Sequence, residues 1–435
     1  MIVFVLDSHN LTAAQQTKSS LDTFCPEWDV ILIETSPALT MNQAIMSCSD
    51  PFFMTLYAGE MVTRSFIQKL VTHMERLPSR AAGILIKQIG THRCHVTNRM
   101  DRRGPILWRL EALSSGPIAG FATQDEFPFE SYVLLEMQYR LNPAWEWDLI
   151  ETDEWQPSQV VNPRWQQPEK EWECLYPILA AQTPIRPSGV PPEVTIVICT
   201  YNNRDYIRWA IRSVMAQTCP NWELIIVNDA SEDDTLQLLH DVSHPFVHVF
   251  NNMVNGGKSK CLNQVLPYVQ GNWLLELDAD DWLEPNCIEK LLEHAVSNHE
   301  IGAIYADHTE WYERTNKQLI YKQIIRSMSD FTAEAMLRCS MPLAPRMYRV
   351  HTLKLIGGWM TSDPFEGRIY EDFQILLRIS LRQSVQHVKM PLYHRRLRNN
   401  SITHLMNGKY EVWKAWIEQN ICDPGREDIS VLPPK

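Results

Sequence analysis

The stretch Glu193-Val194-Thr195-Ile196-Val197-Ile198-Cys199-Thr200 decides the fold, because it is almost wholly apolar and rich in β-branched residues. Such a run is typical of a strand that is covered on both faces, as in α/β proteins. A turn follows at 201–204, and residues 205–217 carry apolar side chains at helical spacing. A second apolar run at 222–227 predicts another strand. The order strand, helix, strand therefore predicts a mostly parallel sheet.

Acidic residues follow two of the predicted strands. Asp229 comes directly after the second strand, and Asp278-Ala279-Asp280-Asp281 follows a further apolar run at 273–277. Ligands of parallel sheets bind where the strands end. Clustered carboxylates repel one another and favour a hard cation such as Mg²⁺ or Mn²⁺, which also binds phosphates. The alternative is an acidic turn that caps the helix near Glu284, a role that Asp281 fits.

The first half of the chain repeats the second. Residues 2–34 align without a gap on residues 196–228. Three later blocks match in the same order: 41–43 with 262–264, 67–73 with 288–294, and 129–132 with 370–373. Collinear blocks of this kind predict two related domains in tandem, at 1–150 and 193–404.

The segment 151–192 lies between the two copies and is rich in proline, which predicts a connector with little regular structure. It also contains Trp155, Trp165 and Trp172, so we expect it to pack along both domains. A short tail at 405–435 follows the second copy.

Composition excludes several classes of protein. The 435 residues predict two or three domains, and the net charge of −12 argues against a general nucleic-acid binder. No window reaches the ~18 apolar residues of a membrane span. The ten cysteines show no disulfide-like spacing, which predicts a reduced, cytoplasmic protein. The cluster His92, Cys94 and His95 lacks a partner at zinc-finger spacing.

Several motifs of the second half stand in a characteristic order. They are Val197-Ile198-Cys199-Thr200-Tyr201-Asn202, Val227-Asn228-Asp229-Ala230-Ser231, Gly256-Gly257-Lys258, Asp278-Ala279-Asp280, Gly357-Gly358-Trp359 and Tyr370-Glu371-Asp372-Phe373. In this order and spacing they resemble the family 2 inverting glycosyltransferases of GT-A fold. The resemblance covers about half of the chain. It implies an α/β protein built of tandem GT-A-like (Rossmann-type) domains, of which the first is truncated.

The resemblance implies a nucleotide-diphosphate sugar as donor, linked to UDP or dTDP. Asp229 would hydrogen-bond the base, and Asp278 would contact the ribose. The residues implied in donor binding are Thr200, Tyr201, Asn203, Asp229, Gly257, Lys258, Asp278 and Ala279.

The resemblance also implies the chemistry of transfer. Asp372 would be the general base, with Glu371 beside it, and the acceptor or sugar would lie near Trp359 and Glu371. Asp280 and His394 would bind the divalent metal, Mn²⁺ or Mg²⁺. Simpler roles stay open: first-turn helix acids for Glu371 and Asp372, core packing for Trp359, and a solvated basic loop around His394.

The first copy has different residues at the positions that correspond to the implied base-binding, metal-binding and catalytic residues. Asp229 aligns with Thr35, the run 278–280 with Tyr57-Ala58-Gly59, and Asp372 with Ser131. The spacing of the blocks also predicts that this copy lacks a helix and a strand at the sheet edge. We therefore expect a domain that is not catalytic and serves for acceptor binding, dimerisation or support.

Rival functions differ in the motifs that they require. A sugar nucleotidyltransferase needs a glycine-rich turn after the first strand, and a nicotinamide dehydrogenase needs GxGxxG; neither is present. The Gln-x-x-Arg-Trp motif of processive synthases is also absent, which predicts a non-processive enzyme acting on a glycan or other hydroxyl acceptor. The alternative from another class is a non-enzymatic nucleotide-sugar or glycan-binding scaffold. The sequence leaves the oligomeric state open.

Overall fold

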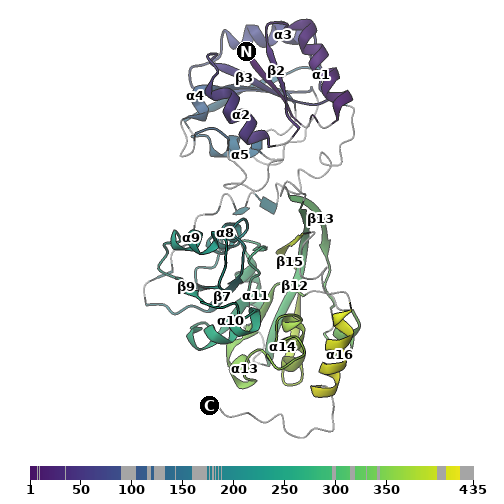
Figure 1. Ribbon diagram of the computed structural model, residues 1–435. Coiled ribbons are helices and arrows are strands. Elements are labelled where there is room, and N and C mark those ends of the chain that lie inside the picture. The colour runs from purple at the N-terminus through teal and green to yellow at the C-terminus, as the bar shows by residue number, and fades with distance from the viewer. Residues whose placement is uncertain are drawn as a thin grey trace. The chain divides into compact units, whose positions relative to one another are not determined.

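The computed structural model describes two compact units (Figure 1). The first is 1–173 with 315–319, and the second is 174–314 with 320–435, so the main division lies between Glu173 and Cys174. Apart from isolated positions between 174 and 187, the described residues are 1–6, 8, 10–34, 36–89, 104–114, 119–121, 133–142, 144–158, 189–295, 300–313, 319–329, 331–339, 343–398 and 408–421. The division falls inside the predicted connector. Its Trp155 is buried in the core of the first unit, whereas Trp165 and Trp172 lie outside the described residues.

The second unit is built on a sheet of nine strands in the order β11-β15-β12-β14-β10-β7-β8-β9, with β13 paired to β12. The strands are β7 (Val194–Thr200), β8 (Trp222–Asn228), β9 (Val247–Asn251), β10 (Trp273–Glu276), β11 (Trp282–Leu283), β12 (Ile301–Glu313), β13 (Leu319–Ile325), β14 (Arg346–Arg349) and β15 (Ser384–Leu397). The neighbours from β10 to β9 are parallel, and β14 runs antiparallel between β10 and β12.

Helices supply the rest of the second unit. They are α8 (Ile207–Met215), α9 (Thr235–His240), α10 (Lys258–Val265), α11 (Cys287–Ala295), α12 (Ala333–Cys339), α13 (Val350–Leu355), α14 (Glu371–Ser380) and α16 (Lys409–Asn420). Ile196 and Ile198 of β7 pack in one core with α8, while Val197 packs in another with α10. Burial on both faces explains why the deciding stretch is apolar at nearly every position.

The first unit has a sheet of six strands in the order β2-β1-β3-β5-β4-β6. The strands are β1 (Ile2–Leu6), β2 (Asp29–Leu32), β3 (Phe52–Tyr57), β4 (Ala81–Lys87), β5 (Ile106–Arg109) and β6 (Glu146–Glu151). The helices are α1 (Leu11–Phe24), α2 (Pro37–Met46), α3 (Arg64–Met74), α4 (Leu110–Leu113) and α5 (Val133–Arg140). The α/β class predicted from the sequence is thus confirmed in both units.

The two sheets share one topology. Taken along the chain, β1 to β6 correspond to β7, β8, β10, β12, β14 and β15, and every shared pairing has the same parallel or antiparallel sense. The edge strand β9 has no counterpart among the described residues of the first unit, where β2 is the edge. Loss of an edge strand leaves the remaining ladder intact. Descent from one ancestor stays a prediction, which this shared order supports.

Two asparagines make the same contacts in the two units. In the first, Asn42 accepts the backbone N–H of Phe121 and donates to its carbonyl, both at 2.8 Å. In the second, Asn263 accepts from and donates to the backbone of Trp359 at 2.8 and 2.7 Å. Each asparagine therefore fastens a helix to a distant loop through a two-bond clasp.

Two arginines also correspond. Arg109 donates from Nε to the carbonyl of Ala81 at the start of β4, and Arg349 donates likewise to Ile301 at the start of β12, each at 2.8 Å. The contacts tie two adjacent strands together at the same place in each sheet, β5 to β4 in the first and β14 to β12 in the second. Because Arg109 and Arg349 make the same contact, they identify equivalent positions in the two sheets.

We expect Asn42→Ala and Asn263→Ala each to lower the free energy of unfolding of its own unit by about 1–3 kcal/mol, because the backbone groups of the clasp lose their partners. Hydrogen exchange read by mass spectrometry localises the loss to one unit at a time. The matched controls are Gln43→Ala and Gln264→Ala, exposed neighbours on the same helices. Equal protection in an asparagine variant and its glutamine control would contradict the clasp.

Candidate functional site

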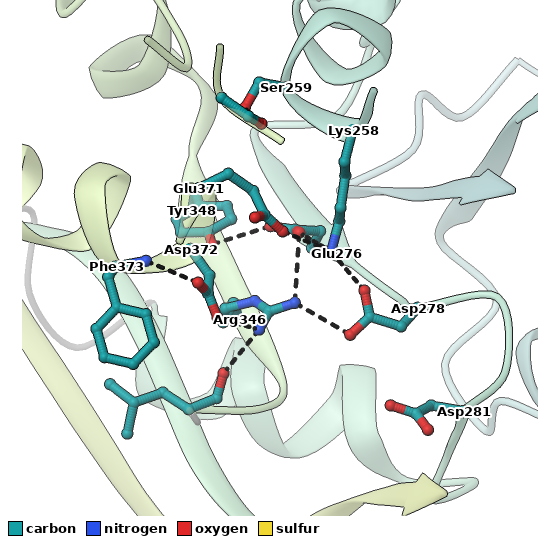
Figure 2. Close-up of polar contacts among 12 residues, drawn as sticks. Lys258, Ser259, Glu276, Asp278, Asp281, Arg346, Tyr348, Glu371, Asp372 and Phe373 are labelled. Carbon is teal, nitrogen blue, oxygen red and sulfur yellow. Dashed lines mark hydrogen bonds and ion pairs between the residues drawn. The ribbon is translucent and has the colours of Figure 1, made fainter. Parts of the chain in front are cut away.

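Charged side chains from several elements of the second unit meet in one cluster (Figure 2). Lys258 opens α10, Glu276 ends β10 and Asp278 follows it, Arg346 opens β14, and Glu371 and Asp372 form the first turn of α14. The structure thus brings together Lys258, Asp278, Glu371 and Asp372, which the sequence had singled out. It adds Glu276 and Arg346, which sequence reasoning missed.

Lys258 is the first cation of the cluster. Its Nζ lies 2.6 Å from Glu276 Oε1 and 3.3 Å from Glu371 Oε1, and it also pairs with Asp278. Burial alone would lower the pKa of Lys258, but the three carboxylates outweigh burial and raise it well above its usual value. The lysine therefore stays an ammonium ion.

Arg346 is the second cation and is almost fully buried. One terminal nitrogen lies 3.0 Å from Asp372 Oδ2, and the other lies 3.3 Å from Glu276 Oε1 and 3.4 Å from Asp278 Oδ2. An arginine remains charged even when it is buried. It therefore joins the carboxylate that follows β10 to the carboxylate at the start of α14.

Glu276 lies at the centre of the cluster and is buried. It accepts a hydrogen bond from the Tyr348 hydroxyl at 3.0 Å. Burial would raise its pKa, but Arg346 and Lys258 hold the pKa below its usual value, so Glu276 stays ionised. The signal that could have identified it is a charged residue inside the apolar run 273–277.

The two acids at the start of α14 have raised pKa values, whereas the pKa of Glu276 is lowered. Burial raises the pKa of Glu371 to about 7, against the opposing effect of Lys258. Burial also raises the pKa of Asp372, although Arg346 and Lys258 oppose it. Glu276, Asp278, Glu371 and Asp372 outnumber the two cations, so the cluster favours retaining a proton near neutral pH.

The orientation of Asp372 is fixed at both oxygens. Oδ1 accepts the backbone N–H of Phe373 at 2.9 Å, and Oδ2 accepts from Arg346. Each carboxylate oxygen has a second lone pair. Asp372 can therefore still accept a proton from a bound hydroxyl group.

Asp281 has a structural role, because its carboxylate holds two segments of the chain together. It accepts from the Tyr393 hydroxyl at 2.8 Å and from the backbone N–H of Arg396 at 2.7 Å. It thereby holds the end of β15 against the turn that follows β10. Burial raises its pKa well above the usual value, and Asp280 and Asp278 add to this.

Asp280 forms an ion pair with an arginine and does not join the other acids in the cluster. Its Oδ2 lies 2.5 Å from the guanidinium of Arg398, which stacks on the ring of Tyr206 with 4.8 Å between guanidinium carbon and ring centroid. Mg²⁺ and Mn²⁺ need only one or two protein carboxylates when substrate phosphates supply other ligands. Asp280 fits such an ion if Arg398 gives way. Among the described residues, no group of three or more His, Cys, Asp or Glu side chains is arranged to hold a metal.

His394 is packed inside the protein. Its Nδ1 accepts from Trp311 Nε1 at 3.0 Å, its Nε2 lies 3.1 Å from Glu284, and its ring stacks on Trp282. Both ring nitrogens therefore face protein groups, and the ring is fully buried. This environment favours packing over metal ligation. The proposed Cys/His cluster at 92–95 lies outside the described residues.

Asp229 holds the glycine loop that leads into α10. It accepts backbone N–H groups of Gly256 at 2.9 Å and Gly257 at 2.7 Å. Burial opposes ionisation, but these donors and Asn252 lower the pKa of Asp229. A residue predicted to contact the base thus also positions the loop that carries Lys258.

The other predicted donor residues surround the end of β7 and the turn after β10. Thr200 is buried, and its hydroxyl has no hydrogen-bond partner among the described residues. Tyr201 is exposed, and its carbonyl accepts from the Asn203 side chain at 3.1 Å. Ala279 is buried next to the acids.

Trp359 lies in the core rather than beside the carboxylates. Only 2% of it is exposed, and its ring meets that of Tyr348 edge-on at 5.8 Å. The structure therefore favours the packing alternative. Its backbone takes part in the clasp with Asn263 described above.

The first unit lacks an equivalent ion cluster within its described residues. After β3, Glu60 accepts the backbone N–H groups of Tyr57 at 2.9 Å and Gly104 at 3.1 Å, which makes it a clasp between loops. Thr35 and Ser131 lie outside the described residues. In neither unit does a described helix have the length and apolar character needed to cross a membrane.

Comparisons with known proteins match much of the second unit to one family. Residues 195–350 match the model described as glycosyl transferase family 2. EpsH of Bacillus subtilis, named as a glycosyltransferase, is 26% identical over 248 residues, covering 53% of this chain and 70% of that protein. The chondroitin synthase of Pasteurella multocida is 26% identical over 220 residues, covering 49% of this chain and 22% of that protein.

A similar solved structure is that of Staphylococcus aureus TarS in complex with UDP. It is 19% identical, with a TM-score of 0.39, and the match covers 49% of this chain and 63% of that one. The chain spans less than half the length of several curated relatives that it matches. The family match ends before α14, so Glu371 and Asp372 lie beyond it. Residues 195–350 of the second unit are a glycosyl transferase family 2 domain.

Proposed function

We propose that the second unit transfers a sugar from a nucleotide-diphosphate donor to an acceptor hydroxyl with inversion at the anomeric carbon. The observation that carries this proposal is the pairing of Asp372 and Asp278 through Arg346 within the charged cluster. This pairing supports the proposal, because it holds the proposed proton acceptor near a carboxylate at the strand end where ligands of such sheets bind. The family 2 match over 195–350 supports a transferase.

Asp372 is the general base of the proposed reaction. It takes the proton of the acceptor hydroxyl as that oxygen bonds to the anomeric carbon, opposite the leaving group. The bond from that carbon to the diphosphate breaks, and the nucleoside diphosphate leaves with the electron pair. Lys258 and Arg346 keep the neighbouring Glu276 ionised, and Glu371 lies beside the base.

The proposed donor is linked to UDP or dTDP. Asp229 and the loop 256–257 would receive the base and ribose together with Thr200, and Asp278 would contact the ribose. Asp280 would hold Mn²⁺ or Mg²⁺. When bound, such an ion neutralises charge that develops on the leaving diphosphate.

The proposed setting is non-processive glycan assembly. Relatives named as chondroitin synthase and as a glycosyltransferase of teichuronic acid biosynthesis support a polysaccharide product. For the first unit we propose a supporting or acceptor-binding role without catalysis. Thr55 and Ile106, which stand where the second unit has Glu276 and Arg346, cannot rebuild the cluster.

Metal binding at Asp280 gives the first prediction for this site. We expect UDP to raise the thermal midpoint of the full chain more with Mn²⁺ than without it, and Asp280→Ala to abolish the difference. Arg398→Met should strengthen Mn²⁺ binding, measured by calorimetry, because the competing guanidinium is gone. The exposed Asp241→Asn serves as control. Unchanged metal dependence in Asp280→Ala would exclude Asp280 as the ligand.

The base gives the second prediction. In a panel of UDP- and dTDP-sugars, Asp372→Asn should reduce donor turnover by about 10²–10⁴-fold, because an amide cannot take the proton. Affinity for UDP should change little. Glu289→Gln, at an exposed acid in the first turn of α11, is the matched control. Full turnover by Asp372→Asn would rule out this base, and binding without turnover by the wild type would favour the scaffold alternative.

The raised pKa of Glu371 gives the third prediction. In the folded protein Glu371 retains its proton up to about pH 7, whereas in the unfolded chain it releases the proton near the ordinary pKa of glutamate. The free energy of unfolding therefore falls as pH rises from the ordinary pKa to the raised one. Glu371→Gln removes this loss, and the variant should gain about 1–3 kcal/mol on the wild type between pH 5 and pH 8. Denaturation at several pH values measures it. A constant difference between the two proteins would contradict the shift.

A further inference from the structure

Arg346 occupies a position that the strand register determines. It opens β14, directly opposite Glu276 on β10 and Tyr305 on β12. Only 5% of its side chain is exposed. The guanidinium therefore lies beneath the charged cluster rather than at its surface, where a substrate would contact it.

The guanidinium divides its two terminal nitrogens between two carboxylates with different proposed tasks. One nitrogen donates to Asp372 and to the carbonyl of Leu343, and the other faces Asp278 and Glu276. We propose that Arg346 is a positioning residue that holds the base Asp372 in one orientation and at a fixed spacing from the donor-binding Asp278. This inference rests on the proposed function, since it deepens the roles given there to both acids.

An arginine suits this task better than a lysine. Its planar fork presents donors in two directions at once, whereas the lysine ammonium is a single point charge. The distances of 3.0 Å to Asp372 and 3.4 Å to Asp278 use that width. Lysine at this position would reach one of the two carboxylates and lose the contact with the other.

The first unit provides an internal comparison. Counting along equivalent strands from Arg109 and Arg349, the pair Glu276 and Arg346 corresponds to the pair Thr55 and Ile106. The aromatic partner is kept, because Trp108 donates to Thr55 at 2.9 Å as Tyr348 donates to Glu276. The same sheet topology thus stands with an uncharged pair where the second unit has a buried ion pair.

This comparison separates folding from function. A buried ion pair is costly to desolvate and is often replaceable by apolar residues without loss of stability. Since the first unit has the sheet without the pair, the sheet does not require it. The charged pair in the second unit therefore serves the acids that it contacts.

Loss of Arg346 should alter the ionisation of the base. The groups that face Asp372 are Arg346 and Tyr348 from β14, Lys258 from α10, Glu276 and Asp278 from the end of β10, and its own neighbours Tyr370 and Glu371. Without Arg346, Lys258 is left to oppose the rise in the pKa of Asp372. The base should then hold its proton to a higher pH.

The test compares full-length variants on the best donor from the UDP- and dTDP-sugar panel. Arg346→Gln should lower kcat about 100-fold near pH 7 with a small change in KM, and should move the acid limb of the kcat profile upward by about one pH unit or more. Arg346→Lys should keep the limb near its original pH and recover part of kcat. A merely structural residue would not move the limb.

Two further variants separate misfolding from mispositioning. Arg349→Gln removes another arginine of the same strand, one that donates to the carbonyl of Ile301 and lies over the ring of Trp273. It should leave the pH profile unchanged. The double variant E276T/R346I copies the pair of the first unit, and should remain cooperatively folded and bind UDP while losing turnover.

A measurement that does not depend on turnover distinguishes failure of the proposed function from failure of the inference about Arg346. The pH at which Asp372→Asn begins to change the thermal midpoint should be higher in the Arg346→Gln background than in the wild type. If that pH moves but the wild type turns over no donor, the proposed function fails and the positioning role stands. If turnover is present but Arg346→Gln keeps the wild-type pH profile and kcat, or if E276T/R346I does not fold, the inference about Arg346 is overturned.

Discussion

The buried guanidinium of Arg346 is the interaction on which the candidate site depends. A pair of opposite charges about 4 Å apart is worth about 4 kcal/mol at the effective dielectric of a protein, and each buried ion costs several kcal/mol to desolvate. One carboxylate would not compensate for burying the arginine. Contacts with Glu276, Asp278 and Asp372 together do, and they hold three acids from two distant segments in one arrangement. Lys258 adds a second positive charge beside Glu276 and Asp278.

The sequence predicts the strands of the sheet better than the side-chain pairs formed between them. The apolar run 193–200 becomes β7, and the shortened spacing in the first copy corresponds to the absent counterpart of β9. These features are local, or follow from the repeat. Arg346 could not be found in this way, because an antiparallel register pairs it with Glu276, a residue far away in the sequence. No local pattern specifies that register.

Residue type alone also left several side chains ambiguous, and packing separates their roles. Asp281 and Asp280 are neighbours, yet one clasps β15 and the other faces Arg398. His394 and Trp359 are residues suited to binding sites, but their rings fill the interior. Whether a polar side chain serves a ligand depends on which strands cross beside it. That information belongs to tertiary structure.

The comparison between the units bears on why the cluster exists. An arrangement kept for stability would be expected in both sheets, since their strand order and their asparagine and arginine clasps coincide. The clasps are present twice, whereas the described residues show the ion cluster in the second unit alone. The fold therefore depends on backbone clasps and apolar strands. The buried charges are an addition that destabilises the protein unless every partner is present, and such additions are typical of sites that act on a ligand.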